Sequence, residues 1–193
     1  KTGSPRADLW KPFFSNYWST PKTIPTKPFL LISSNMTICE NISFKEKISK
    51  MRDTGYFDRS PNLFKERFIW RSNDYLKAII FIEAIKHLSK NNNGYDIVFR
   101  PHPSESVDCW KVLLDGISNV HVVREGAINS WVKNSFAVMH HACTTAIECL
   151  VSKKPLVTYV DSKLKDHLWH NTLSNQLGYL VDSKESLLEK INS

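Results

Sequence analysis

The chain has 193 residues, of which 41% are hydrophobic, and its formal net charge is +7 at pH 7. This length suits one domain with an appendage, and the hydrophobic fraction excludes a wholly disordered protein. The lysines and arginines are scattered, so charge alone does not indicate a nucleic-acid-binding protein. The sequence lacks both an apolar run of the ~18 residues that a membrane-spanning helix needs and the apolar core of a signal peptide. We therefore expect a cytoplasmic protein.

The four cysteines give no sign of a metal site. No two of them are spaced as a C-x-x-C pair, and such pairs are typical of structural zinc sites. We expect reduced thiols at all four positions, because disulfides are rare in cytosolic proteins. The cysteines are Cys39, Cys109, Cys143 and Cys149.

Residues 1–27 are predicted to form an appendage to the main domain. Pro5 suits the first turn of a helix, and we expect an aromatic-rich helix from about Arg6 to Trp18. We favour packing of this helix against a neighbouring domain. Contact with a membrane surface is the alternative, because aromatic side chains beside lysines favour interfaces. Residues 20–28 contain three prolines and three threonines, which indicates a stiff, extended linker.

Residues 28–193 are predicted to form one α/β domain, because strand-like apolar runs alternate with segments of helical periodicity. Strands separated by helices of this length imply a parallel sheet with right-handed crossovers. The fold class is therefore a Rossmann-like parallel sheet with flanking helices. Strands are expected over 29–35 (a buried strand that ends in a polar loop), 95–99, 120–123, 136–139, 155–160 and 179–181. Helices are expected over 42–51 (capped by Asn41), 73–90, 104–114 (capped by Ser104), 128–133, 144–151, 164–173 and 184–191.

The sequence Arg100-Pro101-His102-Pro103 directly follows one predicted strand. The two prolines fix the chain there and delay the next helix. His102 can donate a hydrogen bond to a phosphate oxygen or give a proton to a leaving group. Arg100 can add a bidentate phosphate contact. The alternative is that His102 is an ordinary turn residue.

A second polar segment, from His140 to Glu148, follows another predicted strand. Thr144 and Thr145 are expected at a helix N-terminus, where hydroxyls and backbone N–H groups bind anions. Glu148 lies about one turn further along and could accept hydrogen bonds from a ribose. The alternative is a capping arrangement with Glu148 on the surface. His140 and His141 are candidates for contacts with the nucleobase or the loop, and one of them is expected to pack under the loop.

Two further strand-end loops are weaker candidates. Ligands of open α/β sheets bind at the carboxyl ends of the strands, so these loops could contact the phosphate or the nucleobase of a nucleotide. The second of them could equally be an ordinary turn. The candidates are Ser33, Ser34 and Asn35 in the first loop and Arg124, Glu125 and Gly126 in the second. A G-x-G-x-x-G motif and a P-loop motif are both missing from the sequence, which argues against a dinucleotide or P-loop site.

Three matches give the chain a resemblance to a known family. One is the opening, Thr2-Gly3-Ser4-Pro5-Arg6-Ala7-Asp8-Leu9; the others are His102-Pro103 and Thr144-Thr145 followed by Glu148. Together they resemble the C-terminal half of a GT-B glycosyltransferase. More narrowly, the chain looks like bacterial surface-carbohydrate biosynthesis proteins, and it is similar to sialyltransferases and Kdo transferases that use CMP-activated sugars.

The resemblance implies the donor-binding half of a GT-B enzyme for surface polysaccharide, lipopolysaccharide or capsule synthesis. Its donor would be a CMP-linked sugar such as Kdo or a sialic-acid-like ulosonic acid. In that family an N-terminal half carries the acceptor site and usually the catalytic carboxylate, so no catalytic residue is assigned here. The acceptor would be a glycan or a lipid-linked glycan. A lipid-linked acceptor would bring the protein into peripheral contact with the inner face of a bacterial membrane. No cofactor or metal is expected, since no Asp-x-Asp occurs.

Two alternatives remain open. A CDP-glycerol-type polyol-phosphate transferase, which also resembles the R-P-H-P pattern, or a UDP-GlcNAc 2-epimerase-like enzyme would use the same fold with another donor. A non-catalytic module that binds nucleotides or nucleic acid belongs to a different class. Such a module would bind DNA or RNA with a steep salt dependence, and the scattered basic residues argue against it, so no nucleic-acid partner is expected.

Overall fold

The computed structural model describes residues 5–14, 16–36, 38–60, 62–164 and 172–193. Its centre is a six-stranded sheet in which all strands are parallel, in the order β3-β2-β1-β4-β5-β6. This arrangement confirms the predicted Rossmann-like α/β fold. The strands are β1 (Phe29–Ser33), β2 (Asp96–Arg100), β3 (Val120–Val122), β4 (Ala137–His140), β5 (Leu156–Tyr159) and β6 (Tyr179–Val181).

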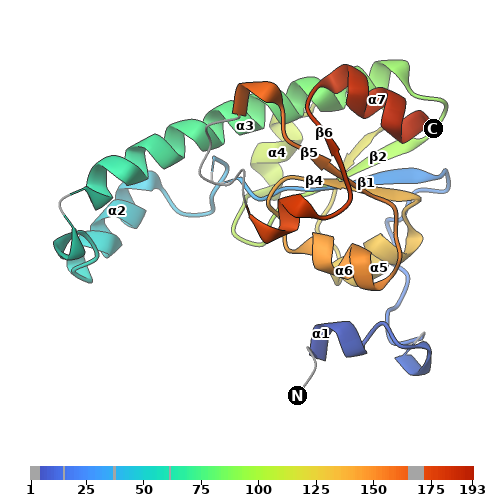
Figure 1. Cartoon of the computed structure of the whole chain (residues 1–193), viewed down its shortest axis with the longest axis horizontal. Helices are drawn as coiled ribbons and strands as arrows, with labels where there is room; N and C mark the ends of the chain where they lie inside the picture. The colour runs from blue at the N-terminus through green and yellow to red at the C-terminus, as the bar shows by residue number, and fades with distance from the viewer. Residues whose placement is uncertain (1–4, 15, 37, 61, 165–171) are drawn as a thin grey trace.

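Helices cover both faces of the sheet (Figure 1). Because side chains alternate along a strand, Leu30 and Ile32 of β1 face one core and Phe29 and Leu31 face the other. The first core is closed by α3 (Leu63–Asn91), α4 (Val107–Leu113) and α7 (Lys184–Asn192). The second is closed by α5 (Ile128–Asn134) and α6 (Thr145–Val151).

The strand order determines where a ligand can bind. The chain moves from β1 outward to β2 and β3, then returns to the other side of β1 to form β4. The strand order therefore reverses between β1 and β4, and the loops that leave their carboxyl ends diverge. In open α/β sheets this divergence creates the ligand crevice.

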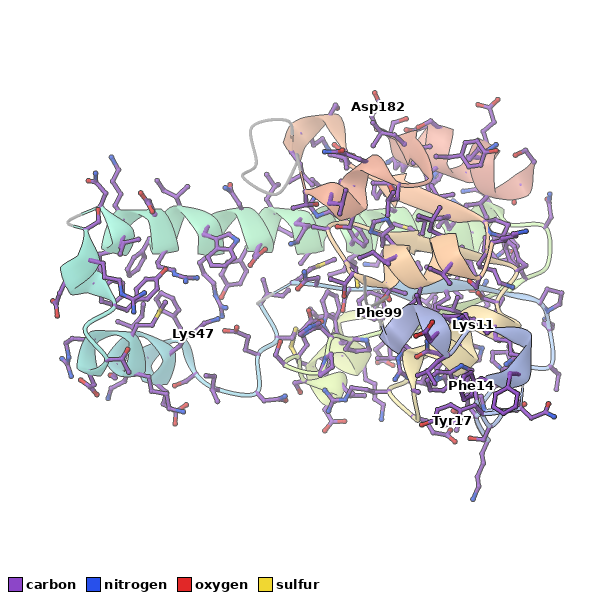
Figure 2. The ribbon with its side chains drawn as sticks, turned by 60° about the horizontal axis from the view of Figure 1, so that its bottom comes forward. Lys11, Phe14, Tyr17, Lys47, Phe99 and Asp182 are labelled. Atoms are coloured by element: carbon purple, nitrogen blue, oxygen red, sulfur yellow. A yellow bond between two sulfur atoms is a disulfide. The ribbon has the colours of Figure 1, made fainter. Side chains whose placement is uncertain are left out.

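The N-terminal segment is shorter and less helical than predicted. A continuous helix from Arg6 to Trp18 is wrong: the segment forms α1 (Pro5–Asp8) and the 3-10 turn η1 (Pro12–Phe14). Pro12 has no N–H to donate, so an α-helix cannot continue through it. Trp10 packs against the core beneath α5 and α6, and Figure 2 shows Lys11, Phe14 and Tyr17 on this segment. Of the opening motif Thr2–Leu9, residues 2–4 lie outside the described part of the chain.

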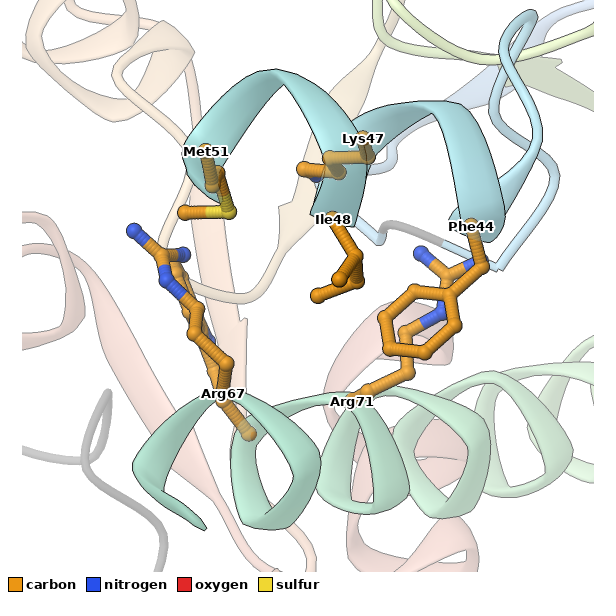
Figure 3. A pocket seen from close by; sticks show the side chains of 7 residues that line it. Phe44, Lys47, Ile48, Met51, Arg67 and Arg71 are labelled. Carbon is orange, nitrogen blue, oxygen red and sulfur yellow. The ribbon is translucent and has the colours of Figure 1, made fainter. Parts of the chain in front are cut away.

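A helical arm extends from the sheet (Figure 1). It consists of α2 (Phe44–Asp53), the turn η2 (Phe57–Arg59) and the first part of the 29-residue α3. Phe44, Ile48 and Met51 point from α2 toward α3 (Figure 3). Among the described helices, neither α3 nor any other combines the length and apolar character that crossing a membrane requires.

Several predicted helix boundaries are corrected. The cap of α2 is Ser43 rather than Asn41, since Ser43 and Glu46 form a capping box. The cap of α4 is Ser106 rather than Ser104. The long helix begins at Leu63, ten residues before the predicted Asn73, because its first turns pack on α2 and η2. Most of the helix predicted over 164–173 lies outside the described residues; the turns η3 (Ser162–Leu164) and η4 (Leu173–Gln176) flank the gap.

The expectation of four reduced cysteines is wrong for two of them. Cys39 and Cys109 form a disulfide that joins the loop after β1 to α4, although 70 residues separate them in sequence. This pairing depends on the crossover that brings α4 beside the β1 loop, so spacing could not reveal it. Cys143 and Cys149 are free and buried.

Two glycines provide a matched test of the packing at the edge of the sheet. Gly178 (φ +82°) and Gly116 (φ +76°) both have left-handed backbone conformations, but a Cβ at Gly178 would lie 2.5 Å from the Leu156 carbonyl oxygen, whereas a Cβ at Gly116 meets open space. We expect Gly116→Ala to lower the free energy of unfolding by about 1 kcal/mol from backbone strain. Gly178→Ala should cost at least about twice as much, because β5 must also move. Urea denaturation measures both, and equal losses would contradict this packing.

Candidate functional site

A cavity of about 300 Å³ lies at the carboxyl ends of β1, β2 and β4. It brings together seven of the predicted site residues: Ser33, Ser34, Arg100, His102, Arg124, Thr144 and Thr145. The remaining lining residues are Pro101, Pro103, Ile128 and Cys143. The described lining therefore holds two arginines, one histidine and four hydroxyl groups, and it contains no carboxylate. This composition is suited to an anionic ligand.

His102 has a defined tautomer at this site. The Ser104 backbone N–H donates to its Nδ1 at 3.2 Å, and the Ser104 Oγ lies 2.8 Å from the same nitrogen. Since Nδ1 accepts a hydrogen bond from an N–H group, the proton of the neutral ring is on Nε2. Partial desolvation lowers the pKa of His102, which keeps the ring neutral at pH 7. Nε2–H can then donate to a phosphate oxygen.

The hydroxyl groups come from both sides of the point where the strand order reverses. Ser33 Oγ donates to Thr145 Oγ1 at 3.3 Å, and this bond links the end of β1 to the start of α6. Thr145 Oγ1 also lies 3.2 Å from Cys143 Sγ. Thr144 is exposed and caps α6 without a side-chain capping bond. The predicted Thr-Thr pair therefore lies in the cavity wall, with Thr145 buried and Thr144 open to solvent.

The two arginines of the cavity also support its loops. The buried Arg100 donates to the carbonyl oxygens of Glu125, at 2.8 Å, and Gly126, and lies over the Trp131 ring. Burial, and secondarily the nearby charge of Arg124, lowers the pKa of Arg100 to about 10, so it stays charged at pH 7. Arg124 is exposed and donates to the carbonyl oxygens of Pro103 (3.1 Å) and Glu105 (2.7 Å).

The Glu125 side chain is directed toward the N-terminal linker and does not line the cavity. Its carboxylate accepts hydrogen bonds from the backbone N–H groups of Lys22 (2.8 Å) and Thr23 (3.1 Å) and from the Thr23 hydroxyl (2.7 Å). These hydrogen bonds lower the pKa of Glu125, and the one from the Thr23 hydroxyl has the largest effect. Gly126 supplies a carbonyl acceptor for Arg100 and has φ +60°. Sequence position alone could not separate these roles from contact with a ligand.

His140 and His141 are both buried. The Cys143 N–H donates to His140 Nδ1 at 3.4 Å, so Nε2 carries the proton and donates to Thr158 Oγ1 at 2.9 Å. Thr158 in turn donates to the Leu177 carbonyl oxygen. Burial lowers the pKa of His140 to about 4, so this histidine is a neutral support under the loop. His141 packs edge-on against Phe81.

Asn35 and Glu148 lie next to the cavity but do not line it. Asn35 Nδ2 donates to the Ala142 carbonyl oxygen at 3.1 Å, while Lys77 Nζ donates to the Asn35 carbonyl oxygen at 2.8 Å. Glu148 is on α6, as predicted, but only 3% of it is exposed, so it is not a surface residue. Its contact with a ribose stays a prediction.

Glu105 is the principal residue that sequence reasoning missed. It is fully buried, and its carboxylate accepts hydrogen bonds from Ser34 Oγ (2.6 Å), Trp110 Nε1 (2.8 Å) and the backbone N–H groups of Met36 and His102. Burial raises the pKa of Glu105, and the bonds from Ser34, Met36 and Trp110 oppose that rise. Its place in the first turn of the helix predicted over 104–114 gives no signal of burial, because glutamates are rarely buried.

Comparisons with known proteins give no family for this chain. No family model and no curated protein matches the chain. It is similar to the Methanocaldococcus jannaschii UDP-GlcNAc 2-epimerase solved with UDP-GlcNAc and UDP, with 13% identity and a TM-score of 0.41. It is also similar to the glycosyltransferase SnogD from Streptomyces nogalater, with 11% identity and a TM-score of 0.43. The alignments cover 98% and 100% of this chain but 41% and 48% of those chains, so this chain spans less than half their length.

Glu105→Ala should strongly destabilise the fold. The change leaves Ser34, Met36 and Trp110 without their common acceptor in a buried environment, and losses of this kind cost about 3 kcal/mol or more. Glu189→Ala, at an exposed position on α7, is the matched control and should change stability by less than about 0.5 kcal/mol. Denaturant unfolding of both variants compares them, and similar free energies of unfolding would show that the Glu105 network contributes little.

His140 should make stability fall with acidification. Its pKa in the folded state, about 4, lies below the ordinary value of 6.5, so its contribution is present above pH 6.5 and is lost as the pH falls toward 4. Between pH 7 and pH 5 the predicted loss is about 2 kcal/mol. In His140→Gln this part of the pH dependence should disappear. The free energy of unfolding of the wild-type chain and of His140→Gln is measured at each pH. Parallel pH profiles for the two proteins would be inconsistent with a buried neutral His140.

Proposed function

We propose that this chain is the donor-binding domain of a GT-B-type enzyme and binds a nucleotide-sugar in the cavity at the ends of β1, β2 and β4. The observation that carries the proposal is the composition of the described lining, which has two arginines, one histidine, four hydroxyls and no carboxylate. The position of the cavity at the reversal of the strand order agrees with the general rule for nucleotide sites in α/β sheets.

In this proposal the nucleotide phosphates lie against His102 and the Thr144–Thr145 pair. His102 Nε2–H and the hydroxyls donate to phosphate oxygens, and Arg100 and Arg124 supply positive charge. These donors would stabilise the charge that develops on the phosphate as the sugar leaves. Glu148 would hold the ribose, which requires that the start of α6 open toward the ligand. No residue of this chain is assigned as nucleophile or general base.

The motif resemblance favours a CMP-linked sugar such as Kdo or another ulosonic acid. Synthesis of surface polysaccharide, lipopolysaccharide or capsule follows as the process, with a glycan or lipid-linked acceptor bound by an N-terminal half. A UDP-linked sugar, the ligand class named for the similar epimerase, or a CDP-linked polyol is the competing donor. Work on a lipid-linked acceptor would place the protein at the inner face of the membrane.

Calorimetric titration of CMP, CDP, UMP and UDP tests the proposal. We expect CMP to bind most tightly, and His102→Ala to weaken its binding by about tenfold or more, because one hydrogen bond to a charged phosphate is lost. The matched control is His121→Ala on β3, where the ring pairs with Asp96 and does not line the cavity. This variant should bind as tightly as the wild-type chain.

The other outcomes separate the alternatives. A preference for UDP or CDP would favour the epimerase-like or polyol-phosphate reading. Nucleotide binding that His102→Ala leaves unchanged would contradict the assignment of this cavity. Salt-dependent binding of oligonucleotides without binding of mononucleotides would favour a nucleic-acid module.

A further inference from the structure

The helix α3 carries an exposed stripe along the side opposite its buried face. The stripe consists of six residues spaced alternately four and three positions apart: Lys65, Ile69, Ser72, Leu76, Ile79 and Glu83. All six are exposed, and the apolar members are 46% (Ile69), 38% (Leu76) and 54% (Ile79) exposed. A repeat of this spacing is the seam of a coiled coil, in which apolar residues recur every 3.5 residues.

No segment in the described part of the chain covers this stripe. The buried residues of α3, among them Lys77, Phe81 and Leu88, face the sheet. On the projecting half, α2 and η2 contact α3 through residues outside the stripe, among them Arg67 and Arg71 (Figure 3) and Phe68. The helix therefore carries apolar residues on two opposite sides, and among the described residues only the sheet-facing side is packed. A helix that is apolar on both sides is normally buried on both.

The stripe is complementary to itself in one antiparallel register. Antiparallel coiled coils pair the first seam position of one helix with the second of the other. Pairing Ile69 with the Ile79 position of a second α3 also pairs Ser72 with Leu76 and Lys65 with Glu83. The pairing is reciprocal, as a twofold axis requires, so it forms two apolar contacts and two ion pairs.

The neighbouring registers are less favourable. A shift of one heptad in one direction places Lys65 against Lys90 and Ile69 against Lys86. A shift in the other direction places Lys65 against Leu76 and Ile79 against Asn62. The first alternative keeps contacts between Leu76 and Ile79, but it sets lysines against each other and against Ile69; the second leaves every apolar residue of the stripe against a polar or charged one. The central register also pairs Ser72 with Leu76, but of the three it alone combines Ile–Ile contacts with Lys–Glu pairs.

We propose that α3 forms a homodimer interface, in which the stripes of two copies of this chain pack antiparallel. The stripe spans 19 residues from Lys65 to Glu83, which corresponds to ~28 Å of helix. This is enough for a two-stranded contact along the arm, on the side of α3 that faces away from the sheet. The inference does not depend on what the cavity binds.

Sedimentation velocity of the 193-residue chain over a range of concentrations tests the proposal. We expect a monomer–dimer equilibrium. Lys65→Glu and Glu83→Lys should each raise the dissociation constant by about tenfold, because each converts two attractive pairs into repulsive ones. The double variant Lys65→Glu/Glu83→Lys should restore the dimer, since it re-forms both pairs with reversed polarity.

Two further variants keep the test decisive. Lys90→Glu makes the same change of charge on the same helix but has no helical partner in the proposed register, so it should leave the dimer unchanged. Ile79→Asp should abolish the dimer while circular dichroism stays unchanged. A chain that is monomeric at every concentration, or a dimer that none of these variants affects, would overturn the proposal. Binding of anionic vesicles that Ile79→Asp abolishes in a monomeric chain would assign the stripe to a membrane surface instead.

Discussion

The site depends on one buried carboxylate. Glu105 receives hydrogen bonds from the loop after β1, from the loop after β2 and from α4. A carboxylate removed from water is tolerated only where donors replace the lost solvent. If the three segments did not meet at Glu105, its carboxylate would be buried without hydrogen-bond donors. Through this constraint, Ser34 and His102 are held at neighbouring positions in the cavity wall.

Additional bonds hold the same segments together. The Cys39–Cys109 disulfide and an antiparallel bridge between Glu40 and Glu105 run beside the carboxylate network. Lys77 reaches from α3 to the Asn35 carbonyl oxygen, which ties the long helix to the same loop. The loop after β1 is thus fixed on both sides, so its serines can form part of a rigid cavity. A rigid wall reduces the entropy that binding would otherwise cost.

The polar residues at the strand ends divide into those that line the cavity and those that support it. His102 and Thr144 present side-chain donors to the cavity. His140 lies beneath the loop and is neutral because burial lowers its pKa. Arg100 belongs to both groups, since it lines the cavity while its guanidinium holds the loop before α5. The same residue types therefore serve two purposes, and only the three-dimensional arrangement separates them.

Much of the fold was predictable because the strands of a parallel sheet are short apolar runs with helices between them. The strand at 29–33 and the helix after Thr144 are confirmed on this basis. Helix ends were less predictable: Pro12 stops a helix that aromatic periodicity favoured, and packing on α2 extends α3 to Leu63. The Cys39–Cys109 bond and the network of Glu105 join segments about 70 residues apart. Local patterns contain no information about such pairings.

The most direct test of the account is a nitrogen-detected NMR titration of the histidine side chains with CMP. We expect His102 to have a protonated Nε2 and an unprotonated Nδ1 in the free chain, and its Nε2 resonance to shift as CMP binds. His140 should keep its neutral signal throughout, since it lies beneath the loop. A His102 resonance that does not respond at saturating CMP, while the nucleotide binds elsewhere, would contradict the assignment of this cavity as the nucleotide site.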